Sequence, residues 1–166
     1  MIGGKIQNYR NILRRYIRDY GENEDINRAV QVLERAKRDA LKAQDKTELI
    51  GYEGMASNAY FEVLPILILN QKTDFPFHGR NRRPPKDAVN AMLSFAYTLI
   101  ANDVAAALET VGLDPYVGFL HTLRPGRTSL ALDMMEELRA YLGDRFILSL
   151  INKRPVSYTH LTLPTN

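Results

Sequence analysis

Apolar side chains recur at helical spacing along nearly the whole chain, and this periodicity constrains the fold more than any other feature. The first stretch places the following residues on one helix face: Ile6, Tyr9, Leu13, Tyr16, Ile17 and Tyr20. Gly21 then suits a left-handed helix end, and Asn23 or Asp25 can cap a second helix of the same period. Two amphipathic helices joined by a short polar loop predict an antiparallel hairpin.

Further helical segments account for most of the remaining chain. We expect them over residues 54–70, 88–110, 128–141 and 144–152. Pro65 should break or kink the first of these, and Asp87 can cap the second. The 88–110 helix is apolar nearly all round, so we expect it in the centre of the core. Because no convincing alternating strand pattern is found, the predicted fold is mainly α.

Length and composition exclude several classes of protein. The 166 residues suffice for one domain with a substantial core. The chain has no cysteine, which excludes disulfide scaffolds, zinc–thiolate sites and thiol nucleophiles. We find no secretion signal and no uninterrupted apolar run of about 18 residues. We therefore expect a cytoplasmic protein without a membrane partner.

Basic residues are gathered in particular segments. The net charge is only +3, from 22 basic and 19 acidic residues, which is a weak preference for an anionic partner. Within residues 1–50 the basic side chains are expected mainly to solvate helix faces. Two clusters lie outside the predicted helices: Arg80, Arg82, Arg83 and Lys86, and then Arg124 and Arg127. The first sits in a loop rich in Pro and Gly, where binding of an anion and a structural role are about equally favoured.

Glu53 and His121 are the first candidates for chemistry. Glu53 stands between Gly51 and Gly54, where a ligand or backbone can approach closely. The alternative is a first-turn acid that the helix dipole favours. His121 follows an apolar stretch and precedes a basic turn that starts at Arg124. The alternative for this imidazole is a satisfied structural residue.

A cluster of acids marks the helix that begins near residue 129. Asp133 and Glu136 are three residues apart and share a face, with Glu137 close to it. Their neighbours are largely apolar, and acids in such surroundings are costly unless they are paired or bind a metal. Pairing with Arg127 or Arg139 is the structural alternative.

Together these acids and the imidazole make a mixed set of oxygen and nitrogen donors, which suits Mg²⁺ or Mn²⁺. Arginines in the adjacent turns suit a phosphate. A metal ion held by such a set polarises a phosphoryl oxygen and activates an attacking oxygen. The residues therefore favour metal-dependent phosphodiester chemistry.

Three strings carry a resemblance to a known family. They are GYEGMASNAYF from residue 51, PFHGRNRRPPKDAVNAMLSFAYTLIANDV from residue 76, and GFLHTLRPGRTSLALDMMEELR from residue 118. In their order and separation they resemble the CRISPR-associated adaptation integrase, a metal-dependent endonuclease that captures spacers, over residues 5–155. The arrangement is most similar to the branch associated with type I-C systems.

The resemblance implies a site and an architecture. Glu53, His121 and Glu136 correspond to the family's catalytic metal ligands, with Asp133 as a supporting or alternative ligand. The implied cofactor is Mg²⁺ or Mn²⁺. Family members pair a small N-terminal β-rich domain with a larger helical domain, and this chain is expected to represent most of the helical catalytic domain without the β-rich one.

The resemblance also implies a reaction and partners. In the family, the 3′-hydroxyl of a captured DNA fragment attacks a phosphodiester at the edge of the CRISPR repeat, as part of antiviral defence. Six basic residues would hold DNA phosphates without reading sequence: Arg80, Arg82, Arg83, Lys86, Arg124 and Arg127. The expected partners are DNA, a second copy in a homodimer and the small companion adaptation protein, in the cytoplasm of a prokaryote.

The last eleven residues share no period with the rest of the chain. Residues 156–166 resemble translated adaptor sequence appended to reading frames from metagenomic reads. We therefore expect a helical nuclease domain over 1–155 and a non-native tail over 156–166. An ordinary C-terminal extension is the alternative.

Rival functions remain open at this point. One is a catalytically inactive, DNA-binding helical fragment of the same family. Another is a purely structural helical module whose acids pair with arginines and which responds to no metal. A helix-turn-helix regulator is disfavoured, because the candidate turns do not precede a short polar recognition helix.

Overall fold

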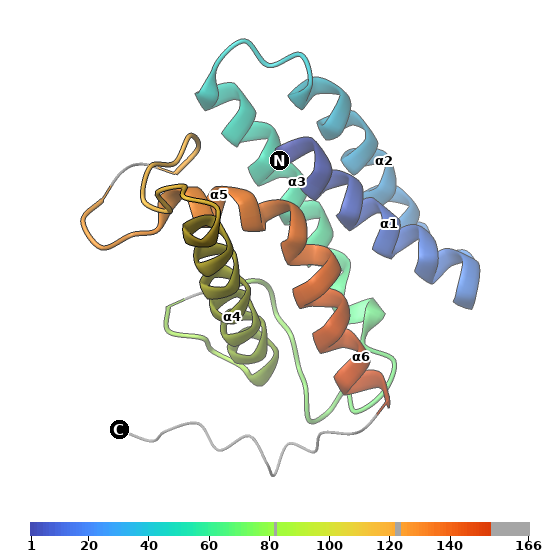
Figure 1. Cartoon of the computed structure of the whole chain (residues 1–166). Coiled ribbons are helices and arrows are strands. Elements are labelled where there is room, and N and C mark those ends of the chain that lie inside the picture. Colours follow the sequence, from blue (N-terminus) through green and yellow to red (C-terminus); the bar gives the residue numbers. More distant parts are fainter. Residues whose placement is uncertain (82, 122–123, 154–166) are drawn as a thin grey trace.

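The computed structural model describes residues 1–81, 83–121 and 124–153, and every regular element in that part of the chain is helical (Figure 1). The elements are α1 (Ile2–Tyr20), α2 (Glu24–Ala40), α3 (Lys46–Leu67), α4 (Ala88–Thr110), α5 (Ser129–Leu138), the π-helix η1 (Arg139–Asp144) and α6 (Arg145–Lys153). The predicted mainly α fold is confirmed. The predicted tail, 156–166, lies outside the described residues.

The predicted hairpin of α1 and α2 is confirmed. Gly21 ends α1 with a positive φ of 94°, a conformation that glycine adopts without strain. The Asn23 side chain caps α2 by accepting the Ile26 N–H at 3.1 Å. α3 packs along α2 and also contacts α1, so these three helices pack on one another (Figure 1).

Helix α3 begins eight residues earlier than the predicted residue 54. Asp45 caps it by accepting the Glu48 N–H at 2.8 Å. The sequence pattern missed this start because the first turns are polar and contain Gly51, a weak helix former. Pro65 lies in the last turn, and the helix ends at Leu67.

Helix α4 has the predicted bounds but not the predicted place. Asp87 caps it as expected, accepting the Asn90 N–H at 2.7 Å. Leu93 and its face are buried against α5, η1 and α6, whereas Phe95 is 67% exposed and Leu99 48% exposed. The expectation of a central core helix was wrong, because described neighbours cover one side of α4 only. By length and composition α4 is also long and apolar enough to cross a membrane.

The last two predicted helices follow each other without a break in helical structure, and the chain bends between α5 and α6 (Figure 1). α5 begins at Ser129, as predicted, and passes through the π-helical turn η1 into α6. Gly143, expected to separate two helices, instead lies against Tyr97 of α4. A Cβ atom at this position would stand 2.9 Å from the Tyr97 ring. This glycine therefore permits a close approach of two helices.

Aromatic and polar contacts connect helices that are distant in sequence. Tyr9 of α1 stacks on Tyr60 of α3, with ring centroids 4.0 Å apart. The loop after α3 is tied to α6 by Asn152, whose side chain accepts the Leu69 N–H at 2.8 Å and donates to the Leu67 carbonyl at 2.9 Å. The chain thus brings α3 and α5, which carry the candidate acids, around the N-terminal half of α1.

Candidate active site

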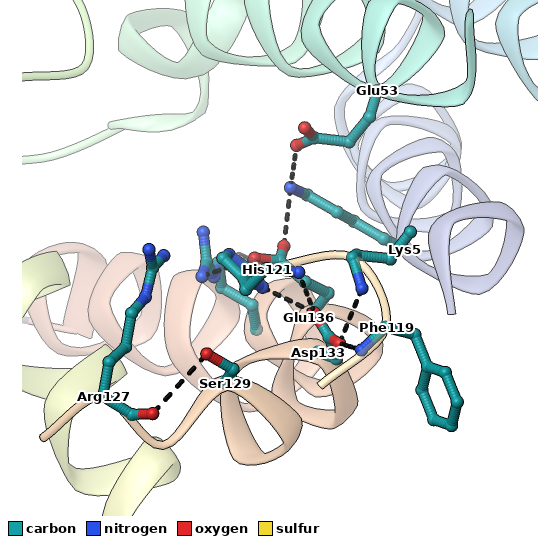
Figure 2. A network of polar contacts seen from close by, with 10 residues as sticks. Lys5, Glu53, Phe119, His121, Arg127, Ser129, Asp133 and Glu136 are labelled. Carbon is teal, nitrogen blue, oxygen red and sulfur yellow. Dashed lines mark hydrogen bonds and ion pairs between the residues drawn. The ribbon is translucent and has the colours of Figure 1, made fainter. Parts of the chain in front are cut away.

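Two predicted site residues, Glu53 and Glu136, converge on one buried cation. The cation is the ammonium of Lys5, a side chain only 1% exposed that extends from α1 (Figure 2). It forms an ion pair with Glu53 of α3 and a second one, at 2.7 Å, with Glu136 Oε2 of α5. Carboxylates separated by 83 positions in sequence therefore face the same small volume.

Each carboxylate has a second partner. The Ser57 hydroxyl donates to Glu53 Oε1 at 3.0 Å, and Arg139 Nη2 pairs with Glu136 Oε1 at 2.8 Å. The structural alternative, pairing with Arg139, is thus observed for Glu136. The alternative for Glu53 is wrong, because this residue lies about two turns after α3 begins.

The electrostatics favour the charged forms of Lys5 and Glu53. Burial disfavours the ammonium, but the neighbouring Tyr9, Glu136 and Glu53 outweigh burial and raise the Lys5 pKa. Burial works against the Glu53 carboxylate too, yet Lys5 and the Ser57 hydroxyl hold its pKa below the usual value. Lys5 and Glu53 therefore form a pair of ions rather than two neutral groups.

Asp133 supports His121. The carboxylate is fully buried and accepts the backbone N–H groups of Phe119, Leu120 and His121, the last two at 2.8 and 3.0 Å. It also contacts His121 Nδ1 at 2.6 Å. Burial would raise the Asp133 pKa, but these hydrogen bonds lower it. A neutral imidazole that donates through Nδ1 presents Nε2 as an electron-pair donor to a ligand.

A glycine makes this arrangement possible. Gly118 lies against the start of α5, where a Cβ atom would stand 2.7 Å from the Ser129 carbonyl carbon and 2.8 Å from Asp133 Oδ2. Any larger residue would push the segment 118–121 away from Asp133. The Gly-Phe-Leu-His string of the sequence therefore has a packing reason as well as a chemical one.

The basic residues are placed unequally. Arg80 packs on α4: its guanidinium donates to Asn90 Oδ1 at 2.8 Å and to Ser94 Oγ at 3.1 Å, and lies 5.3 Å from the Tyr97 ring centroid. Arg80, Arg83 and Arg139 line one pocket of about 310 Å³. Three guanidinium groups around one pocket form an electropositive recess beside Glu136.

Three of the other predicted phosphate contacts, Lys86, Arg124 and Arg127, do not line this recess. Lys86 and Arg124 are exposed, as is Arg83 at the recess, and Arg127 is partly buried. Arg82 lies outside the described residues. Whether any of these side chains binds DNA stays a prediction.

Sequence reasoning missed Lys5 as part of the site. The signal was present in the sequence, because Lys5 belongs to the buried stripe of α1 that also contains Ile2, Ile6 and Tyr9. A lysine on an apolar helix face requires a buried partner of opposite charge. The sequence does not show which acids those are.

The donor types of the predicted ligands fit Mg²⁺ or Mn²⁺, with two carboxylates and one imidazole nitrogen. As the side chains stand, no three His, Asp or Glu residues of the described part surround one point closely enough to hold an ion. The ammonium of Lys5 lies between Glu53 and Glu136. The two carboxylates therefore already form a cation-binding gap, which is the observation that favours a metal there.

The chain shares its helical fold with solved CRISPR-associated proteins. Its overall structure matches a Cas1 protein from Thermotoga maritima with a TM-score of 0.78 at 27% identity, over 99% of this chain and 49% of that one. It also matches a casposase bound to integration product, with a TM-score of 0.73 at 27% identity, over 94% and 42%. A chain of a Cas6-RT-Cas1–Cas2 complex matches with a TM-score of 0.79 at 25% identity, over 95% of this chain and 17% of that one.

Sequence comparison identifies the family. Residues 1–164 match the family described as CRISPR associated protein Cas1. The CRISPR-associated endonuclease Cas1 of Leptospira interrogans is 46% identical over 159 residues, covering 94% of this chain and 62% of that protein. The CRISPR-associated endonuclease Cas1 1 of Chlorobaculum tepidum is 50% identical over 153 residues, covering 90% and 45%. The chain belongs to the Cas1 family.

These matches confirm the resemblance that the sequence predicts. The chain spans about half to two thirds of the length of these relatives. Nothing in the matches addresses the type I-C subtype, which stays a prediction, as does a cytoplasmic location.

Proposed function

We propose that this chain is the helical catalytic part of a divalent-metal-dependent DNA endonuclease and integrase that inserts spacers into CRISPR arrays. The names of the relatives support nuclease activity, and the casposase neighbour is bound to an integration product. The single observation that carries the proposal is the convergence of Glu53 and Glu136 on one cation.

In this proposal Glu53, His121 and Glu136 hold the metal. The chemistry supplied by bound Mg²⁺ or Mn²⁺ is polarisation of a phosphoryl oxygen. Asp133 holds His121 in the tautomer and orientation needed for Nε2 to act as a ligand. Because strand transfer exchanges one phosphodiester for another, the protein acts mainly by positioning and electrostatic stabilisation.

The arginine-lined recess provides the phosphate contacts next to this centre. Arg139 is ion-paired with Glu136 and lies 4.7 Å from the Tyr97 ring centroid, so its position is defined. Arg80 is held by Asn90 and Ser94 on the same wall. Guanidinium groups fixed in this way bind phosphate oxygens with little loss of side-chain entropy on binding.

The proposed partners follow from the neighbours. One structural neighbour is a Cas1 within a complex that also contains Cas2. We infer that this chain likewise acts with a small companion Cas protein, on DNA and as a homodimer. A second candidate, a DNA-binding but inactive fragment, is favoured by the presence of Lys5 between the two carboxylates.

Cleavage of branched DNA by the full chain in Mn²⁺ tests the proposal. Glu136→Gln should reduce strand transfer to background, because it removes one anionic ligand without changing side-chain size. Glu137→Gln, on the exposed side of the same helix, is the matched control and should retain activity. Glu53→Gln and His121→Ala should behave like Glu136→Gln.

Two outcomes would contradict parts of this proposal. Full activity in Glu136→Gln would remove that residue from the site. Binding of the branched DNA without any Mn²⁺-dependent cleavage by the unaltered chain would favour the inactive DNA-binding fragment.

A further inference from the structure

We propose that Lys5 is a positioning residue of the metal centre, whose ammonium aligns Glu53 and Glu136 and must yield its place to the incoming divalent ion. This inference rests on the proposed function and adds a role for a residue outside the predicted ligand set. It makes Lys5 both the support of the site before metal binds and the competitor of that metal.

The placement of Lys5 explains the first role. Glu53 and Glu136 extend from α3 and α5, and α1 packs against both of these helices. Figure 2 shows the Lys5 side chain reaching between the two carboxylates from α1. Because the ammonium pairs with both acids, it fixes their separation from a third element. Without this charge, two anions would face each other in a largely buried volume, which is unfavourable.

The same contacts explain the second role. A divalent ion would be held by oxygens of the same two carboxylates that the ammonium now contacts. Lys5 Nζ stands 2.7 Å from Glu136 Oε2 and also pairs with Glu53, so it fills the volume that a shared ion requires. Two cations cannot occupy this gap together. Metal binding therefore requires the ammonium to withdraw.

The Lys5 side chain is fixed in one position by the residues packed around it. Its side chain is 1% exposed, and its ammonium lies 5.8 Å from the Tyr9 ring centroid. Tyr9 is itself fixed by stacking on Tyr60. The aliphatic part of Lys5 is thus held by packing in the core. Displacing its ammonium costs free energy, which lowers the apparent affinity for the metal.

If the Lys5 ammonium competes with the metal, removing it should change the metal affinity in the opposite direction to a structural defect. Replacing Lys5 by the neutral Met should destabilise the metal-free protein, because the carboxylates lose their shared cation. The same change should strengthen metal binding, because nothing must be displaced. A residue with only a structural role would weaken metal binding when it is lost.

The experiment is a Mn²⁺ titration of the full chain, followed by the free Mn²⁺ signal in electron paramagnetic resonance and by thermal melts. Lys5→Met should lower the Mn²⁺ concentration at half-saturation by about tenfold or more, as expected when a competing state is removed. Lys37→Met is the matched control, since this lysine on α2 contacts the Gln7 amide oxygen at 2.7 Å and no carboxylate of the site. It should bind Mn²⁺ as the unaltered chain does.

Further variants keep the result decisive. Lys5→Gln, which is neutral but retains an N–H donor for the carboxylates, should also bind Mn²⁺ more tightly and serves if Lys5→Met does not fold. Equal or weaker binding in the folded Lys5 variants, with binding still lost in Glu136→Gln, would overturn the role of Lys5 and leave the metal function standing. Absence of Mn²⁺ binding in both the unaltered chain and the Lys5 variants would overturn the metal function and this inference together.

Discussion

At the scale of single residues, Asp133 shows how one buried acid can orient both a backbone segment and a neighbouring imidazole. Its two oxygens accept three backbone N–H groups and contact His121 Nδ1. All these donors come from the short segment that starts after Gly118. One carboxylate therefore fixes both the path of the chain and the orientation of the imidazole.

Asp133→Asn should consequently damage stability and metal binding. The new NH₂ group would face backbone donors instead of accepting them, which should cost about 2–3 kcal/mol of unfolding free energy. Loss of the support for His121 should weaken Mn²⁺ binding by about 10–100-fold. Urea unfolding and Mn²⁺ titration would measure the two effects, with the exposed Asp103→Asn as control. Unchanged Mn²⁺ affinity would show that His121 needs no such support.

Asp144 is a second buried acid, with the opposite electrostatic behaviour. It is completely buried, and burial raises its pKa to about 6 although the Tyr97 hydroxyl donates a hydrogen bond to it. Between about pH 4 and 6 the folded protein retains a proton that the unfolded chain has released. This group therefore makes stability fall as pH rises through that window, and the loss is complete above it.

Asp144→Asn should remove this pH dependence. A shift of about two pKa units corresponds to about 3 kcal/mol, so the variant should gain up to that amount relative to the unaltered chain between pH 4 and pH 7. Urea unfolding at several pH values would measure the difference. Parallel stability curves for the two proteins would show that Asp144 does not titrate in this window.

At the scale of elements, helix ends were easier to predict than helix surroundings. The caps at Asn23 and Asp87 were predicted from local sequence and are confirmed. Capping depends on a few adjacent residues, so it can be read from the chain. The exposed face of α4 could not be predicted from the sequence. An apolar helix has the same sequence pattern whether neighbouring helices cover one side of it or all sides.

Two glycines in helical elements should respond oppositely to alanine. Gly143→Ala would place a Cβ atom 2.9 Å from the Tyr97 ring and should cost about 1–3 kcal/mol through overpacking. Gly51→Ala meets nothing within 4 Å in the exposed part of α3 and should gain about 0.5–1 kcal/mol from helix propensity. Thermal or urea unfolding of both variants would test this. A neutral Gly143→Ala would mean that the α4–η1 contact adapts without cost.

At the scale of the whole molecule, the placement of the basic side chains bears on the proposed binding of DNA. Arg80 is already engaged with α4, whereas Arg83 is exposed on the rim of the recess that Arg139 also lines. A phosphate contact by Arg83 would contribute to affinity through release of counterions. Its effect should therefore depend on salt.

Arg83→Glu should weaken binding of branched DNA and reduce the slope of log affinity against log salt by about 1. Fluorescence anisotropy at several salt concentrations would measure it. Arg28→Glu changes the net charge equally on the exposed surface of α2 and should have the smaller effect. Equal effects of the two variants would assign DNA binding to net charge rather than to the recess.

The helical class, most helix bounds, the caps and the family could all be predicted from the sequence, which also indicates the residues proposed to carry the chemistry. These features depend on periodicity, short motifs and their order, all of which are properties of the chain as written. The first residue of α3 could not be predicted correctly, because weak helix formers in its first turns obscure the helical period of the apolar residues.

Which charged side chains come into contact depends on how the helices pack. Lys5 reaches acids 48 and 131 positions away, and no local rule pairs them. Whether α4 is enclosed or half exposed was likewise settled by the packing of neighbouring helices. Burial makes such distant contacts energetically decisive, since a charge removed from water must find its partner wherever the fold has placed it.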